Sequence, residues 1–377
     1  VVGLLATTLS PAAPMIGAYL VARSGARKRW VLWGPGGVSR LALLAMAAVP
    51  LVFRGPAAVW GFVALLSLQA FASAVGMPAH HSLLGDVVPL PIRGRFMGAG
   101  MMFNSIAAVL VLPVAGFLVA RIGGLSGYQV LWLLAALAGL GATAMYWRIP
   151  EPPSEEGAAT QGGPLGGLRE AWGSLRGNRP FLLFCGINFL WTVGINISGP
   201  FFTVHMVEGL GFSADTIAYL ATFTTLFNVV ALRLAGGLVD RHGAPKMTAI
   251  AMLLVPLMPL LWVFASTPVH IGIAKVYGFF AWAGFHVAAL PMLLLLAPPR
   301  YRSQYMAVFN TVNGVAGVLA PLPASWLYAN WGFTSNLLIS AGGRMAAGLL
   351  FLWLWRRGVL LPGTAPEEET ERELARA

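Results

Sequence analysis

Gly236-Gly-Leu-Val-Asp-Arg-His-Gly-Ala-Pro-Lys246 is a short polar stretch between two long apolar segments. Its position predicts a tight turn between two membrane-spanning helices, at the membrane surface where polar backbone and charged groups meet water. A weaker copy, Leu20-Val-Ala-Arg-Ser-Gly-Ala-Arg-Lys28, has Leu, Val, Arg, Gly, Ala and Lys at matching places. A basic turn that occurs once in each half of a chain indicates an internally duplicated transporter.

The composition is that of a protein surrounded by lipid. Of the 377 residues, 58% are hydrophobic and 10% are charged, whereas soluble domains carry about 25% charged residues. A net charge of +11 would suggest a nucleic-acid partner in a soluble protein. The basic residues here lie in short loops between apolar segments, so we expect a lipid bilayer as partner and no nucleic acid. The single cysteine, Cys185, excludes an internal disulfide.

The hydrophobic pattern predicts an all-α multi-pass membrane protein. A helix needs about 20 apolar residues to cross a bilayer. Eleven segments meet this requirement, and they lie at 1–22, 30–53, 57–84, 96–119, 128–147, 181–206, 214–238, 247–265, 269–297, 304–328 and 336–355.

The distribution of Lys and Arg predicts the orientation of these spans. Alternate loops, beginning with Arg23–Arg29, carry nearly all the basic residues outside the spans, and the opposite loops carry Arg54 and Arg121. Cytoplasmic loops are the ones enriched in Lys and Arg. We therefore expect a multi-pass protein of the cell (inner) membrane, with the central loop and the C-terminus in the cytoplasm.

The hydrophobic pattern breaks once, in a segment rich in Pro, Gly and Glu that is typical of a flexible linker. We expect an N-terminal bundle over 1–147, a cytoplasmic linker over 148–179, a C-terminal bundle over 180–357 and a disordered tail over 358–377. Within the linker, apolar residues at helical spacing predict either a short amphipathic helix on the membrane surface or an ordinary solvated linker helix; they are Leu165, Leu168, Trp172 and Leu175.

A second internal match supports the duplication. Arg93–Gly123 aligns with Arg302–Gly332 so that Arg93 coincides with Arg302, Asn104 with Asn313 and Gly123 with Gly332. The two copies lie in equivalent spans separated by an even number of spans, which predicts parallel repeats and not inverted ones.

These turns and repeats resemble the major facilitator superfamily of transporters. Members have two six-helix halves joined by a cytoplasmic loop, with the signature turn Gly-x-x-x-Asp-Arg-x-Gly-Arg-Lys between the second and third helix of each half. The second half matches it at Gly236, Asp240, Arg241 and Gly243. The first half matches it at Arg23, Gly25 and Arg27, whereas Ala22 replaces the Asp and Ala18 the first Gly.

The resemblance also fixes which helices of the family this sequence contains. The stretch Asp86–Arg95 is similar to the family's turn between helices four and five. If Leu20–Lys28 is the turn between helices two and three, Val1 lies in helix two. We therefore expect eleven of the family's twelve helices, without the first.

The resemblance implies a secondary transporter that moves a small organic solute by alternating access. A sugar-like solute and efflux of a drug-like solute both remain open, as does coupling to a proton, and we expect a monomer. The alternative is a membrane sensor or scaffold derived from a transporter. We expect no enzyme, catalytic residue, metal or cofactor, since we find no Ser-His-Asp arrangement, metal-ligand spacing or phosphate loop on a credible frame.

In the family, the Asp of the signature turn is thought to hold the cytoplasmic ends of the two halves together. A helix N-terminus favours a nearby anion by about 0.3–1 kcal/mol when exposed, and by up to ~2 kcal/mol when partly buried. We expect Asp240 to face the start of the span at Phe96 as the stronger side of an asymmetric latch, because Ala22 lacks a carboxylate; capping of its own loop is the alternative. The predicted gating residues are Gly236, Asp240, Arg241, Gly243, Arg23, Gly25, Arg93 and Arg95.

Polar and aromatic groups within the apolar spans are candidates for a substrate cavity: Gln69, Asn104, Asn188, Trp191, Asn228, Lys275, His286, Asn310 and Asn313. Buried amides are costly in lipid unless they have partners, so each either lines the cavity or bonds helix to helix. Asn104 and Asn313 are preferred because they are repeat-related. Lys275 could bind an anionic substrate or extend to the membrane surface. No carboxylate lies near a bilayer midplane, so proton coupling would need Asp86, a histidine or an acid on the missing helix.

Overall fold

The fold is known from a computed structural model that describes residues 12–152 and 172–360. Within these ranges all the regular elements are helices. The first group is α2 (Ala13–Ser24), α3 (Arg27–Val31), η1 (Leu32–Val38), α4 (Ser39–Val52), α5 (Pro56–Val87), η2 (Leu90–Ile92), α6 (Arg93–Ile122) and α7 (Gly124–Trp147). The second group is α9 (Arg179–Ser198), α10 (Phe201–Val204), η4 (His205–Gly209), α11 (Ala214–His242), α12 (Ala244–Leu254), α13 (Leu257–Val263), α14 (Pro268–Leu296), η5 (Pro299–Tyr301), α15 (Arg302–Leu319) and α16 (Pro321–Arg356).

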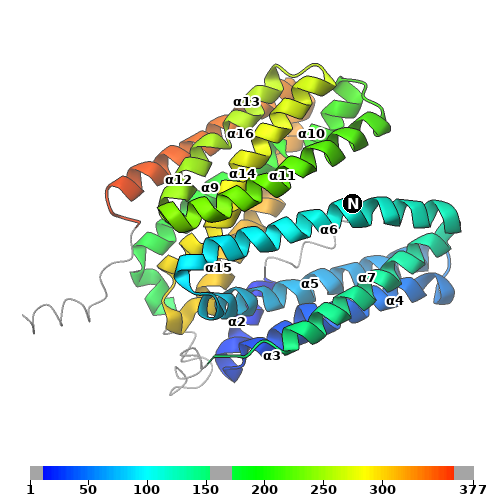
Figure 1. Cartoon of the computed structure of the whole chain (residues 1–377), viewed down its shortest axis with the longest axis horizontal. Coiled ribbons are helices and arrows are strands. Elements are labelled where there is room, and N and C mark those ends of the chain that lie inside the picture. The colour runs from blue at the N-terminus through cyan, green and yellow to red at the C-terminus, as the bar shows by residue number, and fades with distance from the viewer. Residues whose placement is uncertain (1–11, 153–171, 361–377) are drawn as a thin grey trace, which may run out of the picture.

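The two groups of helices form two bundles that lie side by side (Figure 1). In the first bundle α5 packs against α2 and α4, and α4 packs against α7. In the second bundle α9 packs against α15 and α16, while α14 packs against α11 and α12. The bundles meet chiefly where α6 packs against α11 and where α15 packs against α2 and α5.

The predicted all-α multi-pass membrane fold is confirmed. Nine helical stretches of the described chain are long and apolar enough to span a membrane. Two differences explain why nine stretches are found where the sequence predicted eleven spans. Only Ala13–Ser24 of the first predicted span is described, and the last two predicted spans form one stretch, Pro299–Arg356. Gly332 divides that stretch, because its backbone has φ 75° and ψ 177°, which interrupts the helix.

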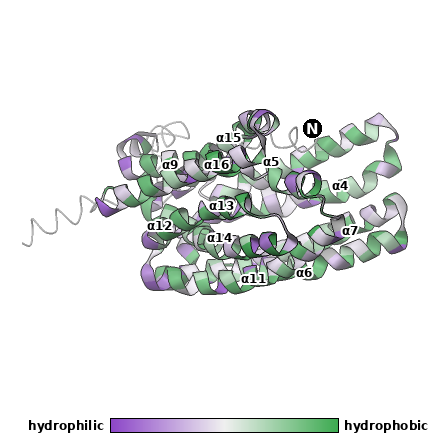
Figure 2. Cartoon of the chain, turned by 90° about the horizontal axis from the view of Figure 1, so that it is seen from above, coloured by the Kyte–Doolittle hydropathy of each residue, from purple (hydrophilic) through white to green (hydrophobic). Residues whose placement is uncertain are grey.

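Hydrophobic residues predominate along the lengths of the helices, and hydrophilic residues gather at the ends of the bundles (Figure 2). Large side chains such as Trp60, Phe103 and Phe117 are more than 60% exposed. A soluble protein would bury such residues or use them in an interface. A belt of this kind along helices of spanning length is the surface that hydrocarbon chains cover.

The internal repeat is visible in the backbone conformation and also in the side chains. Gly123 and Gly332 have nearly the same conformation, with φ 75° at both and ψ 163° and 177°. Glycine suits this region of conformational space because it has no Cβ. Their repeat-related partners Arg93 and Arg302 are the first residues of α6 and α15.

The predicted linker helix falls largely outside the described residues, as Leu165 and Leu168 do. Residues 172–177 are helical. Leu175 is buried in the core of the second bundle, whereas Trp172 is 51% exposed.

The bundles touch at one end and separate toward the other. We call the end where α7 finishes at Trp147 and α9 begins at Arg179 the linker side, and the opposite end the far side. From the linker side, α6 and α11 run next to each other and diverge toward the far side (Figure 1). Their approach depends on Gly98 of α6, where a Cβ atom would lie 2.7 Å from the Leu232 carbonyl oxygen of α11.

Replacing Gly98 with alanine should therefore weaken the contact between the bundles. The added methyl forces α6 and α11 apart, and overpacking of this kind costs about 1–3 kcal/mol. We expect a lower unfolding temperature for Gly98→Ala, measured by thermal denaturation in detergent.

The matched control is Gly100→Ala on the same helix, where a Cβ has no neighbour within 4 Å. Alanine is the better helix former by about 1 kcal/mol, so this control should be neutral or stabilising. Equal effects of the two substitutions would contradict the close approach at Gly98.

Candidate gate and substrate cavity

Asp240, at the linker-side end of α11, reaches across to the first turn of α6. Its Oδ1 accepts a hydrogen bond from the Gly94 backbone N–H at 2.6 Å, and its Oδ2 accepts one from the Arg95 N–H at 2.9 Å. These amides are among those that a helix N-terminus leaves without an intrahelical partner. The carboxylate is 8% exposed, so it makes a charged bond to a helix N-terminus in a partly buried setting, the arrangement in which such a contact is strongest.

Two glycines allow Asp240 to reach these amides. A Cβ on Gly94 would lie 2.5 Å from Oδ1 of Asp240, and one on Gly236 would lie 3.0 Å from the Gly94 carbonyl oxygen. Any larger residue at either position would push α11 away from α6. The first glycine of the signature turn therefore has a packing role, and its effect is to seat the aspartate.

A second carboxylate crosses in the opposite direction. Asp86, near the end of α5 in the first bundle, forms ion pairs with Arg27 of its own bundle and with Arg302 at the start of α15 in the second. Arg27 is 1% exposed and also donates to Ser82. The three charges together link α3, α5 and α15 on the linker side.

The other predicted gating residues differ in what they contact. Arg93 is buried and donates to the carbonyls of Gly85 and Val88 at 2.7 and 3.1 Å, so it caps the end of α5 and does not bind Asp240. The Arg95 side chain is 69% exposed, with its Nε 3.6 Å from Oδ2 of Asp240. Arg23 and Arg241 are exposed, and Gly25 and Gly243 form positive-φ turns.

The sequence pattern missed Arg27 and Arg302 as gating residues. Arg27 matches the signature turn as Arg23 does, but only Arg27 turns into the protein to meet Asp86. A signal for Arg302 was present in the repeat, since its partner Arg93 was predicted to act at the same kind of helix start. The sequence pattern does not indicate which arginine of each pair faces a carboxylate.

Five of the nine predicted cavity residues line one cavity of about 560 Å³ in the second bundle: Asn188, Trp191, Asn228, His286 and Asn313. Asn188 of α9 donates to Oδ1 of Asn313 on α15 at 2.7 Å, and Thr192 donates to the same oxygen at 2.9 Å. We call this the central cavity. It borders the other bundle, since Asn228 of its wall donates to Ser105 of α6 at 3.0 Å.

Two polar atoms in the central cavity lack protein partners. Oδ1 of Asn188 and Nε1 of Trp191 are buried without a hydrogen bond. An unpaired polar group away from bulk water costs roughly 1–3 kcal/mol. Both atoms are covered by neighbouring groups. The aromatic rings of Trp282 and Phe285 lie 6.0 and 5.1 Å from the Trp191 ring.

The remaining predicted cavity residues lie elsewhere. Asn104 lines a cavity of about 720 Å³ within the first bundle, together with His80 and Tyr146. Lys275 lines a smaller cavity of about 290 Å³ next to the central one. Gln69 and Asn310 are not among the residues that line the central cavity. The repeat relation of Asn104 and Asn313 thus does not bring them to one site.

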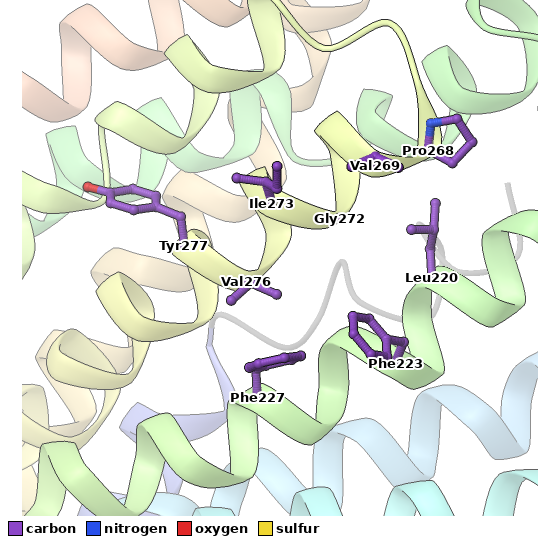
Figure 3. A pocket seen from close by; sticks show the side chains of 9 residues that line it. All are labelled: Leu220, Phe223, Phe227, Pro268, Val269, Gly272, Ile273, Val276 and Tyr277. Carbon is purple, nitrogen blue, oxygen red and sulfur yellow. The ribbon is translucent and has the colours of Figure 1, made fainter.

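A fourth hollow, between α11 and α14, has a different character. Figure 3 shows its lining, which is apolar except for the hydroxyl group of Tyr277. The Tyr277 hydroxyl already donates to the Leu254 carbonyl at 2.7 Å. With no free polar group in its wall, this groove suits lipid chains and does not suit a polar solute.

Helices of membrane-spanning length in two repeat-related bundles, with a polar cavity at the border between them, define a membrane transporter. The family model described as Major Facilitator Superfamily matches residues 1–197 and again residues 184–376. The chain belongs to the Major Facilitator Superfamily, and the double match corresponds to its two halves.

Several known proteins are similar to this chain. The uncharacterized protein Rv2265 of Mycobacterium tuberculosis is 26% identical over 329 residues, covering 86% of this chain and 76% of the relative. The multidrug resistance protein MdtG of Klebsiella pneumoniae is 22% identical over 308 residues, covering 79% and 71%. The structure of the proton:xylose symporter XylE bound to 6-bromo-6-deoxy-D-glucose aligns with a TM-score of 0.73 at 15% identity, covering 94% of this chain and 86% of that one.

The amide pair in the central cavity should contribute to stability. Asn313→Ala removes the acceptor of two hydrogen bonds and leaves Asn188 and Thr192 without it, which should cost roughly 1–3 kcal/mol. We expect a lower unfolding temperature in detergent. Asn330→Ala is the control, because Asn330 is exposed and bonds only to the Trp326 carbonyl of its own helix. An unchanged unfolding temperature for Asn313→Ala would contradict a buried, bonded pair.

Proposed function

We propose that the chain moves a small organic solute across the membrane by alternating access, and that the structure is its state closed on the linker side. The pair of carboxylates that cross between the bundles carries this proposal. Asp240 binds the start of α6 and Asp86 binds the start of α15, both on the linker side. Toward the far side the two bundles diverge (Figure 1).

The linker side is the cytoplasmic side in this proposal. The loops at that end carry nearly all the Lys and Arg outside the spans, and the loops at the far end carry Arg54 and Arg121. The positive-inside rule then places the linker in the cytoplasm. The state described here is therefore open outward.

Transport requires the bundles to rock about the central cavity until the linker side opens. The contacts of Asp240 and Asp86 exist only while the linker side is closed, so they bias the equilibrium toward the outward state. A solute offsets this bias only if it binds the inward state more tightly than the outward state. The bias must therefore be no more than a few kcal/mol, because reversing a 99:1 ratio of states already needs a difference in binding of about 5.5 kcal/mol.

The central cavity suits a small solute with both polar and flat apolar parts. A volume of about 560 Å³ lies within the range of sites for small molecules. Asn188, Thr192 and Asn313 supply hydrogen bonds, and Trp191 and Trp282 supply ring faces. The relatives act on both kinds of solute that the sequence left open, since XylE is a xylose symporter and MdtG a multidrug resistance protein.

Replacing Asp240 with asparagine should shift the equilibrium toward the inward-open state. Asparagine keeps the shape but loses the charge at the α6 N-terminus, a loss of roughly 1–2 kcal/mol, or about a fivefold to thirtyfold change in the ratio of states. A cysteine reporter at Ile195 of the cavity wall, in a Cys185→Ala background, measures this. Labelling by an impermeant maleimide should fall from the outside and rise from the inside.

Arg95→Gln is the matched control, because the Arg95 side chain is exposed and contributes a surface ion pair worth about 0–1 kcal/mol. It should leave labelling nearly unchanged. Asp86→Asn should act in the same direction as Asp240→Asn. If neither aspartate variant alters the labelling pattern, these contacts are not a gate.

Reconstituted protein should carry a ligand across the membrane. A thermal-shift screen against sugars, amino acids, organic anions and cationic drugs should identify a ligand, because binding to the folded state stabilises it by mass action. Flux of that ligand into proteoliposomes should exceed flux into protein-free liposomes. Dependence of the rate on an imposed proton gradient would show coupling, and its absence would show facilitation.

Binding without flux would contradict the transport proposal. It would favour the alternative of a sensor or scaffold, in which ligand binding changes the state of the bundles but moves nothing across the membrane.

A further inference from the structure

One face of α14 lines two neighbouring cavities. Lys275, Phe279, Trp282 and His286 follow one another at spacings of three and four residues, which places them on a single helix face. Phe279, Trp282 and His286 line the central cavity. Lys275 lines the smaller cavity of about 290 Å³, and Phe279 and Trp282 belong to the walls of both. Lys275 therefore lies at the outward extension of the central cavity.

Lys275 has no partner of its own among the residues that the structure describes. No hydrogen bond or ion pair involves its ammonium group, and no acidic side chain lines its cavity. Arg344, another cation within the spans of the second bundle, has hydrogen-bond partners in the protein. It is 2% exposed and donates to Ser198 at 2.8 Å and to the Ile195 carbonyl at 3.3 Å. A charge in a membrane span without such bonds marks a functional position.

The wall around Lys275 contains an indole N–H and three threonine hydroxyls but no carboxylate. The indole Nε1 of Trp262, a residue 2% exposed, is buried with no hydrogen-bond partner. Indole N–H and ammonium groups can only donate. The Thr224 hydroxyl donates to the Leu220 carbonyl of its own helix at 2.6 Å, so toward the cavity it can only accept. The charge of Lys275 has no negative partner in this wall, and a negatively charged group would complement it.

We infer that Lys275 binds the anionic group of the transported solute, which is a small organic carboxylate. This inference rests on the proposed function of the central cavity. The carboxylate lies at Lys275, the body of the solute lies against Phe279 and Trp282, and its polar end meets Asn188 and Asn313. One cation suits a singly charged carboxylate; a doubly charged phosphate would leave part of its charge without a partner.

A lipid phosphate is the other possible source of an anion at this position. Lys275 lies about 11 Å along α14 from its first residue, at 1.5 Å per residue, so its side chain could extend toward the membrane surface. The face of α14 on which Lys275 lies favours the solute over a lipid as the source of the anion. The adjoining face of α14, with Gly272, Ile273 and Val276, carries the apolar groove (Figure 3), whereas Lys275 shares the face of the central cavity.

The test measures binding as thermal stabilisation of the full chain in nanodiscs of neutral phosphatidylcholine. The probes are small aromatic and aliphatic carboxylates, each paired with its neutral amide. We expect at least one carboxylate to stabilise the protein where its amide does not. Lys275→Met should lower the affinity for that carboxylate by about tenfold or more, since it removes a charge pair. Lys275→Arg should restore most of the binding.

Arg121→Met is the matched control. It removes one positive charge at the far side, from the exposed last turn of α6, and should leave carboxylate binding unchanged. Equal stabilisation by each carboxylate and its amide in the wild type would overturn the inference without any variant. So would a Lys275→Met protein that still prefers the carboxylate.

The lipid source is tested with nanodiscs that contain phosphatidylglycerol. If stabilisation through Lys275 occurs only with that lipid and never with a soluble carboxylate, the residue binds a headgroup and the inference is wrong. The assay reads binding and not flux. Carboxylate binding without flux would reject the transport proposal while leaving the anion site intact.

Discussion

The contact between the Asp240 carboxylate and the amino end of α6 joins the two bundles on the linker side. It is strong for a simple reason: two backbone amides with no other partner meet a partly buried negative charge. The glycines at positions 94, 98 and 236 exist on these helices because the carboxylate and the facing backbones must come this close. The two carboxylates that cross between the bundles both lie at the linker-side end, away from which the bundles diverge (Figure 1).

In each half of the repeat an acidic residue crosses to the other bundle, but the two acids lie at different positions. The second half has Asp240 in its signature turn, where the first half has Ala22. The first half has Asp86 at the end of α5, where the repeat places Leu295 in the second. The result is one carboxylate crossing in each direction. The expected latch was asymmetric, with Asp240 as its stronger side. The structure adds a second carboxylate that crosses the other way, because Asp86 forms an ion pair with Arg302.

The polar groups of the central cavity all come from the second bundle in the described part of the chain. Amides inside lipid must find partners, and Asn188, Thr192 and Asn313 find one another across α9 and α15. Asn104, which the repeat relates to Asn313, lies in a cavity within its own bundle. Repeat symmetry predicts equivalent places on equivalent helices. Whether two such places face one site depends on how the bundles are oriented.

The sequence by itself determined the helical class, the family, the length of the spans and the two turns, because hydrophobic length and glycine-rich polar turns are local properties of the chain. It also singled out Asp240 and most of the polar residues of the central cavity, since a charge or an amide in an apolar segment is visible without coordinates. Only the tertiary structure decided that Arg27 and not Arg23 meets Asp86, that Arg93 caps α5, and that Lys275 shares a helix face with the cavity. These depend on which way a helix is turned toward its neighbours, and that is set by packing between segments far apart in the sequence.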